Sequence, residues 1–252
     1  ITVTLRDGTQ YDATLVGTDE KTDLAVLKID ASGLQPAVFG SSSDLKVGEQ
    51  AIVIGNPLGQ LGGSVTSGII SALDREITVD GHTMALLQTD AAVNPGNSGG
   101  GLFNANGELV GIINAKSSGD NVEGLGFAIP SDTVKEVVDA IIQNGYVPGR
   151  VSLGLSVVDI TDAQTAMMYR VDTLGVYILS VNEGSNAEKA GLQAGDRITA
   201  IGDKEVSSTS DITTALDEYS VGDQVQITIV RDGRTGTAAI TLEEQSHTSS
   251  ES

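Results

Sequence analysis

The chain has 252 residues, of which 39% are hydrophobic and 3% aromatic, with 31 glycines and no Trp or Cys. This composition suits one large domain or two ordinary ones and excludes wholesale disorder, while the absence of cysteine excludes disulfides, cysteine-based zinc sites and a thiol nucleophile. The net charge of −20 opposes nucleic-acid binding, which needs Lys and Arg to displace counterions from phosphates.

Residues 1–130 predict an almost entirely β domain. Short β-branched runs alternate with Gly, Asp and Asn, and this density of short strands is typical of a barrel or sandwich. The expected strands are 1–5 (ITVTL), 11–17 (YDATLVG), 24–29 (LAVLKI), 50–55 (QAIVIG), 64–73 (SVTSGIISAL), 84–89 (MALLQT) and 109–116 (LVGIINAK). Because the chain opens directly on a strand, we expect it to be the downstream part of a longer protein.

The hydrophobic period changes after residue 130, which predicts a helix and linker over residues 131–149. The apolar residues that share one helical face are Val134, Val137, Val138, Ile141 and Ile142. Ser131 is the expected N-cap and Gly145 the expected C-cap, and the Pro148-Gly149 pair marks a boundary.

Residues 150–243 predict a second domain of mixed α+β pattern. Its expected strands are 153–158, 175–181, 197–202, 224–233 and 237–242, and its expected helices are 162–170, 186–191 and 210–219. The paired acids Glu243 and Glu244 are typical of a solvated acidic face, and residues 244–252 predict a disordered tail.

The stretch NPGNSGG, residues 94–100, surrounds Ser98 with glycines. A serine hydroxyl needs a base to take its proton and preorganised donors to hold the oxyanion that forms. Gly96 lets its own N–H and that of Ser98 point to one spot, and the glycines after Ser98 leave room for a substrate. An ordinary glycine turn is the alternative for this stretch alone.

A carboxylate in the stretch TDLAVLKID, residues 22–30, fits the same chemistry. Asp23 stands just before an apolar strand, where a buried carboxylate could orient an imidazole. A turn or cap carboxylate is the alternative. Asp90 in QTDAAV is interpreted as a structural turn residue.

Ordered motifs over roughly residues 1–243 resemble the HtrA/Deg (Do-like) trypsin-fold serine proteases that carry C-terminal PDZ domains. The motifs are TDLAVLKI, GNPLG, VTSGIISAL, QTDAAVNPGNSGG, GFAIPSDTVKEVV, SLGL and NAEKAGLQAGDRITAIG. The resemblance implies a mainly β trypsin-like double barrel with an incomplete first barrel, followed by an α+β PDZ domain.

The resemblance also implies roles for particular residues. Ser98 is the implied nucleophile and Asp23 the triad carboxylate, and Gly96, Asn97 and Ser98 form the implied oxyanion hole. The implied substrate-binding strand consists of Ile113, Asn114, Ala115 and Lys116, beside a loop at 117–123.

The chain departs from the family pattern in its histidines. The family's general base is a histidine in a T-x-x-H-V segment about thirty residues before the triad aspartate. Only 22 residues precede Asp23, so the corresponding position is not in the sequence. His82 is interpreted as an exposed turn residue and His247 as a solvated tail residue. We therefore expect the printed chain to be inactive by itself.

In a PDZ domain a peptide terminus adds as a strand to a sheet edge, and backbone N–H groups hold its carboxylate. The resemblance assigns the carboxylate-binding loop to Ser152, Leu153, Gly154 and Leu155. Ile212 and Leu216 share a helical face toward the peptide, although packing in the domain core is the alternative for both.

The resemblance implies a serine endopeptidase that degrades unfolded or misfolded proteins in protein quality control, with peptide C-termini as ligands of the PDZ domain. It implies no cofactor and no metal, an extracytoplasmic location and a homotrimer of the intact protein. A non-proteolytic, chaperone-like peptide binder is the alternative function.

Overall fold

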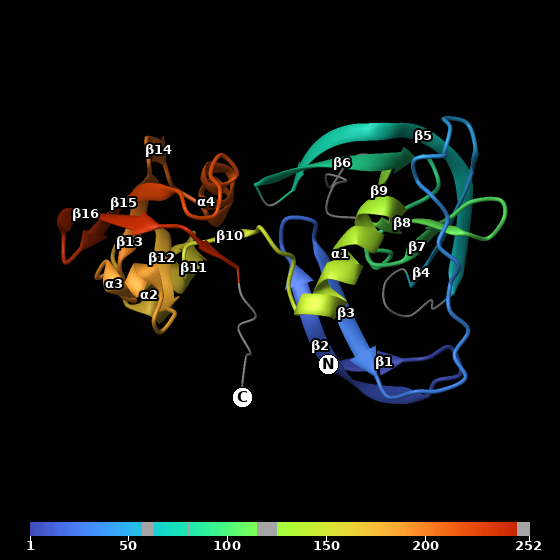
Figure 1. Ribbon diagram of the computed structural model, residues 1–252, viewed down its shortest axis with the longest axis horizontal. Helices are drawn as coiled ribbons and strands as arrows, with labels where there is room; N and C mark the ends of the chain where they lie inside the picture. Colours follow the sequence, from blue (N-terminus) through green and yellow to red (C-terminus); the bar gives the residue numbers. More distant parts are fainter. Residues whose placement is uncertain (57–62, 80, 115–124, 246–252) are drawn as a thin grey trace. The chain divides into compact units, whose positions relative to one another are not determined.

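The computed structural model describes residues 1–56, 63–79, 81–114 and 125–245 (Figure 1). These residues belong to two compact units, one formed by residues 1–79 and 83–146 and the other by residues 80–82 and 147–252. The described part is built mainly from strands, as the sequence predicts.

The first unit begins with a small antiparallel sheet of order β1-β2-β3. Its strands are β1 (Thr2–Thr4), β2 (Gln10–Asp19) and β3 (Leu24–Ile29). A bulge between Leu15 and Gly17 interrupts the pairing of β2 with β3. This open sheet stands where the sequence predicts an incomplete first barrel.

Six further strands close into a barrel of order β4-β5-β6-β9-β8-β7. They are β4 (Gln50–Gly55), β5 (Ser64–Val79), β6 (His82–Thr89), β7 (Gly101–Phe103), β8 (Leu109–Ile113) and β9 (Gly126–Pro130). Period-two alternation turns Ala51 and Val53 of β4 inward. The barrel core also contains Ile70, Leu87, Leu102, Val110, Ile113 and Ala128.

Helix α1 (Ser131–Asn144) packs against β2, β3, β8 and β9, so it belongs to the first unit rather than to a segment between two domains. Its buried face contains Val134, Val137 and Ile141, whereas Ile142 is 62% exposed. Gly145 ends the helix in the left-handed conformation that the sequence predicts.

The predicted cap at the start of α1 is wrong by one residue. Pro130 occupies the N-cap position, and Ser131 is already helical and donates its hydroxyl to the carbonyl of Gly40. The hydroxyl of Ser42 instead accepts the N–H of Asp132. A neighbouring loop thus supplies the capping hydroxyl.

The second unit contains a sheet with the path β11-β12-β13-β15-β16 and a side pairing of β14 with β13. The strands are β10 (Val151–Ser152), β11 (Leu155–Ile160), β12 (Gly175–Val181), β13 (Arg197–Ile201), β14 (Lys204–Glu205), β15 (Gln224–Arg231), β16 (Arg234–Thr241) and β17 (Glu243–Glu244). The helices are α2 (Ala163–Tyr169), α3 (Asn186–Lys189) and α4 (Thr209–Leu216).

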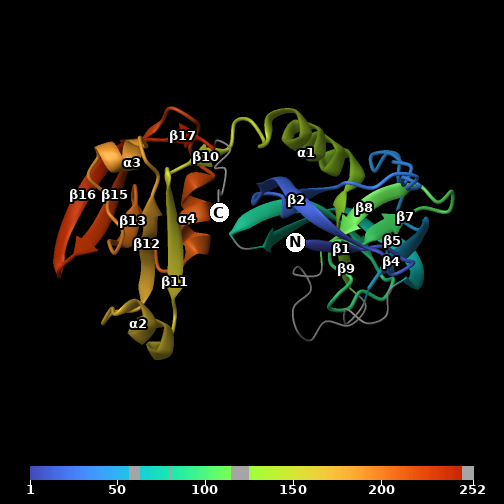
Figure 2. The ribbon, with the colours of Figure 1, turned by 90° about the horizontal axis from the view of Figure 1, so that it is seen from below.

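Two apolar clusters stabilise the second unit on different sides of its sheet. The larger cluster packs α3 and α4 on the sheet and includes Val176, Ile198, Ile201, Ile227 and Ile240. The smaller one joins Ile160 and Tyr177 to Ala166 of α2. Figure 2 shows α4 beside β11, the strand at one end of the sheet path.

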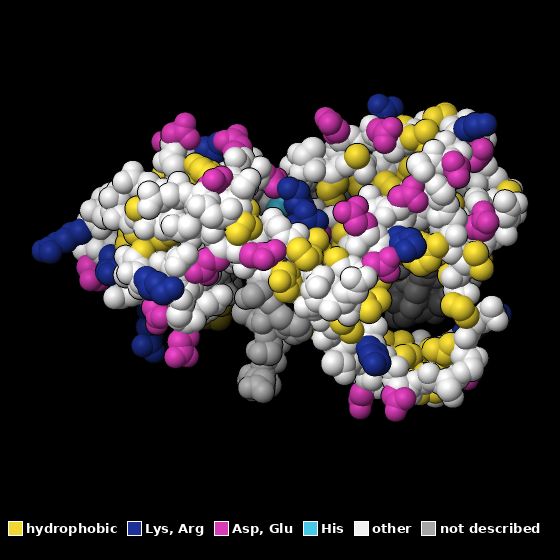
Figure 3. Space-filling model, in the orientation of Figure 1, with side chains coloured by type: hydrophobic (Ala, Val, Ile, Leu, Met, Phe, Trp, Pro, Cys, Tyr) yellow, Lys and Arg dark blue, Asp and Glu magenta, His cyan; other side chains and the backbone are white. Residues whose placement is uncertain are grey.

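Charged side chains do not gather into a single patch on the face drawn in Figure 3. Asp and Glu side chains are spread over both units there, with Lys and Arg among them. The acidic residues behind the net charge of −20 are therefore spread over this face rather than concentrated in one patch.

Candidate active site and peptide-binding edge

Ser98 lies in a tight loop between β6 and β7 and is exposed. The loop closes with hydrogen bonds from the N–H of Asn97 to Asn94 and from the N–H of Gly100 to Asn97. On the far side of Ser98, the N–H of Gly99 donates to the carbonyl of Ile113 over 2.9 Å. The backbone therefore holds the serine from both sides.

Glycines give this loop its shape. Gly96 and Gly99 have φ values of 96° and 80°, which other residues rarely adopt. A Cβ atom on Gly100 would lie 2.5 Å from the carbonyl oxygen of Ile54. The sequence prediction of a special backbone around Ser98 agrees with this geometry.

Asp90 fixes the start of the loop, as its interpretation as a structural residue requires. Its Oδ1 accepts the N–H of Ile69 over 2.7 Å, and the hydroxyl of Thr89 donates to the carbonyl of Ile69 over 2.8 Å. A Cβ on Gly68 would collide with the same Asp90 oxygen. These contacts fix the direction in which the chain leaves β6.

Asn97, a predicted oxyanion-hole residue, is only 3% exposed. Its Oδ1 makes no hydrogen bond to any residue in the described part of the chain. A Cβ on Gly55, at the end of β4, would collide with this oxygen. Gly55 therefore makes room for the Asn97 side chain under the loop.

Asp23 ends the turn between β2 and β3, in the left-handed conformation with φ 55°. The sequence prediction of a buried carboxylate is wrong, because this turn at the end of the small sheet leaves Asp23 exposed. Beneath the turn lies Asp19, which is 1% exposed and accepts the hydroxyl of Thr22 over 2.7 Å. That buried bond ties the turn together.

Asn114 connects Asp23 to the Ser98 loop. Its Nδ2 donates to Oδ2 of Asp23 over 3.3 Å, and its own N–H donates to Phe127 in β9. The preceding residue, Ile113, accepts from Gly99 and donates to the carbonyl of Gly100. A short hydrogen-bonded path thus runs from the candidate carboxylate to the neighbours of the candidate nucleophile.

The predicted substrate-binding strand is only partly described. Ile113 is 2% exposed within the barrel core, and its N–H and carbonyl both form hydrogen bonds with the Ser98 loop. Asn114 is also buried. Ala115, Lys116 and the loop 117–123 lie outside the described residues.

His82 begins β6, at the opposite end of that strand from Thr89. With a rise of about 3.3 Å per residue, seven steps separate the two ends by about 23 Å. The Ser98 loop follows the Thr89 end. His247 lies outside the described residues.

The predicted carboxylate-binding loop precedes β11 in the second unit. Gly154 has φ 71°, and a Cβ there would lie 2.7 Å from Cβ of Ser185, so packing alone requires this glycine. The N–H of Gly154 donates to Oγ of Ser152 over 3.0 Å. Leu153 is buried in the core, whereas Leu155 begins the strand.

Two glutamates lie in the strand that pairs with Ser152; Glu244 is exposed, as its interpretation as part of a solvated acidic face requires, whereas Glu243 is half-buried. Glu243 and Glu244 form β17, which pairs with β10, so the prediction that Glu244 belongs to a disordered tail is wrong. Oε1 of Glu243 accepts the N–H of Asn186, and Oε1 of Glu244 accepts the N–H of Gly149. Strand pairing at the end of the second unit brings both acids to these backbone donors.

Helix α4 contributes the other two predicted peptide-binding residues. Ile212 is 5% exposed in the core, as its alternative interpretation expects, and Leu216 packs partly buried against the same cluster. Sequence reasoning missed Asp159 and Thr209, which join β11 to the first turn of α4. The signal for Asp159 was a charged residue within the apolar strand LSVVDI.

Two hollows lie elsewhere in the described ranges. One, of about 390 Å³, is lined by Ser42, Ser43, Leu73, Asp74, Ala85, Leu87, Pro130, Asp132 and Thr133. Burial favours the neutral form of Asp132, but hydrogen bonds from Ser43 and Ser42 outweigh it and lower the pKa of that carboxyl.

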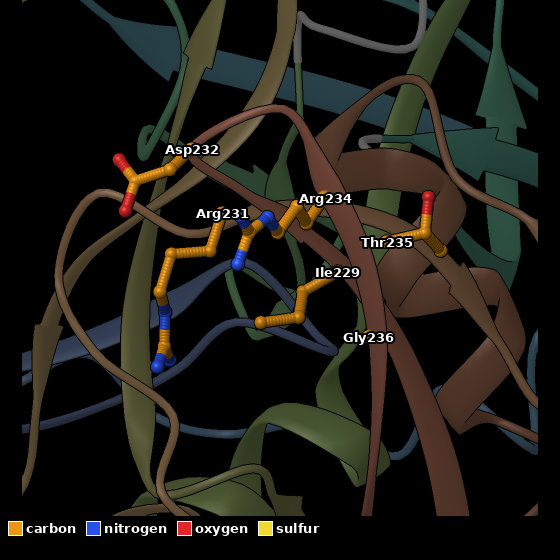
Figure 4. A pocket seen from close by; sticks show the side chains of 6 residues that line it. All are labelled: Ile229, Arg231, Asp232, Arg234, Thr235 and Gly236. Atoms are coloured by element: carbon orange, nitrogen blue, oxygen red, sulfur yellow. The ribbon is translucent and has the colours of Figure 1, made fainter.

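The other hollow, of about 530 Å³, lies over the β15–β16 hairpin. Figure 4 shows Arg234 above Ile229 and extending toward Arg231, whose side chain runs downward beside Ile229, while Asp232 points away. Arg231 is held by Asp196, which is 1% exposed, through bonds of 2.5 and 2.6 Å. The hydrogen bond with Asp196 raises the pKa of Arg231.

The described side chains form no group of three His, Asp or Glu residues suited to a metal ion. None of the helices in the described ranges is long and apolar enough to cross a bilayer.

Two protein families match the chain, and each covers one unit. The trypsin-like peptidase domain matches residues 1–112, and the PDZ domain matches residues 151–242.

Named relatives match nearly the whole chain. Serine protease Do-like HtrB of Bacillus subtilis is 46% identical over 99% of the chain and 57% of its own length. A probable periplasmic serine endoprotease DegP-like of Rickettsia prowazekii is 41% identical over 93% of the chain and 46% of its length. The chain thus spans about half the length of these relatives.

A solved structure described as HtrA-type protease AlgW with decapeptide is also similar. It is 36% identical, has a TM-score of 0.55, and is matched over 97% of this chain and 75% of its own.

Proposed function

The chain belongs to the Do-like HtrA serine proteases and carries a trypsin-like and a PDZ domain, and from this membership we propose that Ser98 and Asp23 are the nucleophile and the orienting carboxylate of an endopeptidase. Its substrates are unfolded or misfolded polypeptides. The observation that carries the proposal is the path from Asp23 through Asn114 and Ile113 to the residues flanking Ser98.

In the proposed mechanism, Ser98 attacks the scissile carbonyl while a histidine takes its proton. The N–H groups of Gly96 and Ser98 stabilise the oxyanion, and the positive φ of Gly96 supports that role. Asp23 orients the histidine and stabilises its charged form. Asn114 holds Asp23 from the side of the Ser98 loop.

The base is the component that the printed chain does not supply. Its two histidines are His82, at the remote end of β6, and His247. We infer that the 252 residues alone have little or no proteolytic activity and that a histidine from outside them completes the site. Loss of one triad member costs orders of magnitude in rate.

The second unit binds the carboxyl terminus of a peptide beside β11. β11 is an end strand of the described sheet, so one of its edges is unpaired there and suits strand addition. The loop Ser152–Leu155 receives the carboxylate, and Ser152 Oγ must release the Gly154 N–H that it now accepts. The peptide-bound AlgW structure supports this use of the family fold.

For the intact protein we propose an extracytoplasmic location and a homotrimer. The location is supported by relatives whose names place them in the periplasm. The trimer follows from the family resemblance and is tested by sedimentation.

The test of the enzymatic proposal uses the intact protein and a fluorophosphonate probe that labels activated serines. We expect labelling and casein cleavage in the wild type, loss of both in Ser98→Ala, and no loss in Ser220→Ala, a control at an exposed serine of the second unit. If the intact wild type neither labels nor cleaves but suppresses aggregation of unfolded proteins, the chaperone-like alternative replaces the protease.

A further inference from the structure

Asp23 adopts a backbone conformation that is mostly adopted by glycine in the described ranges. Its φ is 55°, and Arg170 and Asp232 are the other non-glycine residues with positive φ among the described residues. A side chain in this region costs free energy, although Asp tolerates it better than most residues. Such outliers persist where the surrounding structure holds them. The proposed orienting carboxylate therefore needs contacts that hold its backbone in place.

Four residues join β2 to β3, because Asp19 and Leu24 are the last pair of their ladder, and Asp23 is the final one of the four. The N–H of Asp23 donates to the carbonyl of Glu20 over 3.3 Å, which is long for a bond of this kind. The shorter bond across the turn joins two side chains. The hydroxyl of Thr22 donates to Oδ2 of Asp19 over 2.7 Å. This side-chain bond closes a turn that the backbone bond holds only weakly.

The bond between Asp19 and Thr22 is buried. Asp19 is 1% exposed and Thr22 is 9% exposed, so water does not readily replace the hydroxyl as a donor, and loss of that donor is costly. Asp19 lies two residues after Gly17, where a Cβ would collide with the end of α1. Since alternate residues of a strand share a face, Asp19 is on the face of β2 that packs on α1. The turn is thus anchored in the interior of the first unit.

The position of Thr22 connects this anchor to the candidate site. Thr22 directly precedes Asp23, so its side chain fixes the peptide group from which Asp23 starts. Asn114 donates to Oδ2 of Asp23 over 3.3 Å. Asn114 therefore holds the carboxylate, whereas the Asp19–Thr22 pair holds the backbone that carries it. A displacement of about 1 Å in a catalytic constellation can lower a rate by about a hundredfold.

We propose that Asp19 and Thr22 are positioning residues of the endopeptidase and keep Asp23 in the conformation that orients the catalytic histidine. Both act through Asp23, without touching the substrate or the reacting atoms. This inference rests on the proposed roles of Ser98 and Asp23 and adds two residues to the machinery behind them.

The test measures steady-state cleavage of a peptide substrate by the intact protein. We expect Thr22→Val, which has a similar shape but no donor, to lower kcat about tenfold and to leave KM nearly unchanged. Thr22→Ser keeps a hydroxyl and should retain most of kcat. Thr237→Val makes the same change at an exposed position of β16 and should leave both constants unchanged. Active-site titration counts the competent sites, so an unfolded fraction does not lower the measured kcat.

The pH profile of kcat/KM separates positioning from a purely structural role. A carboxylate held beside the histidine favours the charged imidazolium, so the enzyme becomes active only at higher pH. Thr22→Val should move the acid limb of the profile to lower pH, because a displaced Asp23 favours the imidazolium less. A substitution that only loosened the fold would lower the activity without moving this limb.

A double-mutant cycle assigns the effect to the bond itself. Asp19→Ala removes the acceptor, so Thr22→Val should lower kcat little further in that background. Additive losses, an unmoved acid limb, or a Thr22→Val enzyme as active as the wild type would overturn the inference while the wild-type activity still supports the proposed function. If the intact wild type neither cleaves the peptide nor labels with a fluorophosphonate, the proposed function fails and the inference fails with it.

Discussion

Asn114 and Asp23 are 91 positions apart in the sequence, yet Nδ2 of the first lies 3.3 Å from Oδ2 of the second. The amide comes from the end of β8 in the closed barrel, and the carboxylate from the turn of the small sheet. This contact joins the two parts of the first unit at the candidate site.

Replacing Asn114 with Ala should lower kcat of the intact protein about tenfold and leave KM nearly unchanged, because the amide orients Asp23 rather than holding the substrate. Asn114→Asp should lower kcat further by placing a like charge beside Asp23. Steady-state cleavage of a peptide substrate measures both constants. Asn106→Ala, in an exposed turn, is the control, and a raised KM with unchanged kcat would show that Asn114 binds substrate instead.

Gly55→Ala should disturb the Ser98 loop from below. The new Cβ collides with the buried side chain of Asn97, and overpacking of this kind costs about 1–3 kcal/mol of unfolding free energy. Fluorophosphonate labelling of Ser98 should slow as well. Gly236→Ala is the matched control, because nothing lies within 4 Å of its added Cβ, and equal effects of the two substitutions would contradict the prediction.

Arg231→Met should destabilise the second unit by about 2–3 kcal/mol, because Asp196 would remain buried without its charged partner. Arg234→Met changes the same residue type across the hairpin, where the described residues give Arg234 no ion pair, and should be nearly neutral. Urea unfolding of the two variants makes the comparison. Similar midpoints would show that the Asp196 pair contributes little.

The stability contributed by Asp211 should disappear in acid. Hydrogen bonds from the side chain and backbone of Ser207 lower the pKa of Asp211 from 3.8 to about 2, so its contribution is complete above pH 3.8 and is lost as the pH falls through about 2. Denaturant unfolding of wild type and Asp211→Asn should differ most near neutral pH and converge near pH 2. Ser207→Ala should reduce the same difference, and a gap that is constant with pH would refute the assignment.

The sequence predicts regular strands well where a short apolar run is bounded by turn residues. The strands β3, β4 and β12 begin and end at the predicted residues. β7 has three residues and β9 is a continuous apolar run, so neither shows the alternation that the predicted strands rely on. Barrel closure, rather than local preference, makes them strands.

In the candidate site, too, some features could be predicted from the local sequence and others could not. The special backbone around Ser98 could be predicted from its glycines, because a positive φ and a close backbone approach each require glycine at a single position. The exposure of Asp23, its contact with Asn114 and the bond between Asp159 and Thr209 depend on residues 50 to 91 positions apart. Such pairings follow from the tertiary fold, and the one local sign of them noted above is the charge of Asp159 within an apolar strand.

The close approach of β2 to the end of α1 has a consequence for synthesis. A Cβ on Gly17 would collide with the carbonyl oxygen of Gly145, so the small sheet that carries Asp23 rests on the last turn of a helix made more than a hundred residues later. The sheet therefore gains this support only after residue 145 has left the ribosome, and until then the first three strands of a growing polypeptide lack the helix against which they pack.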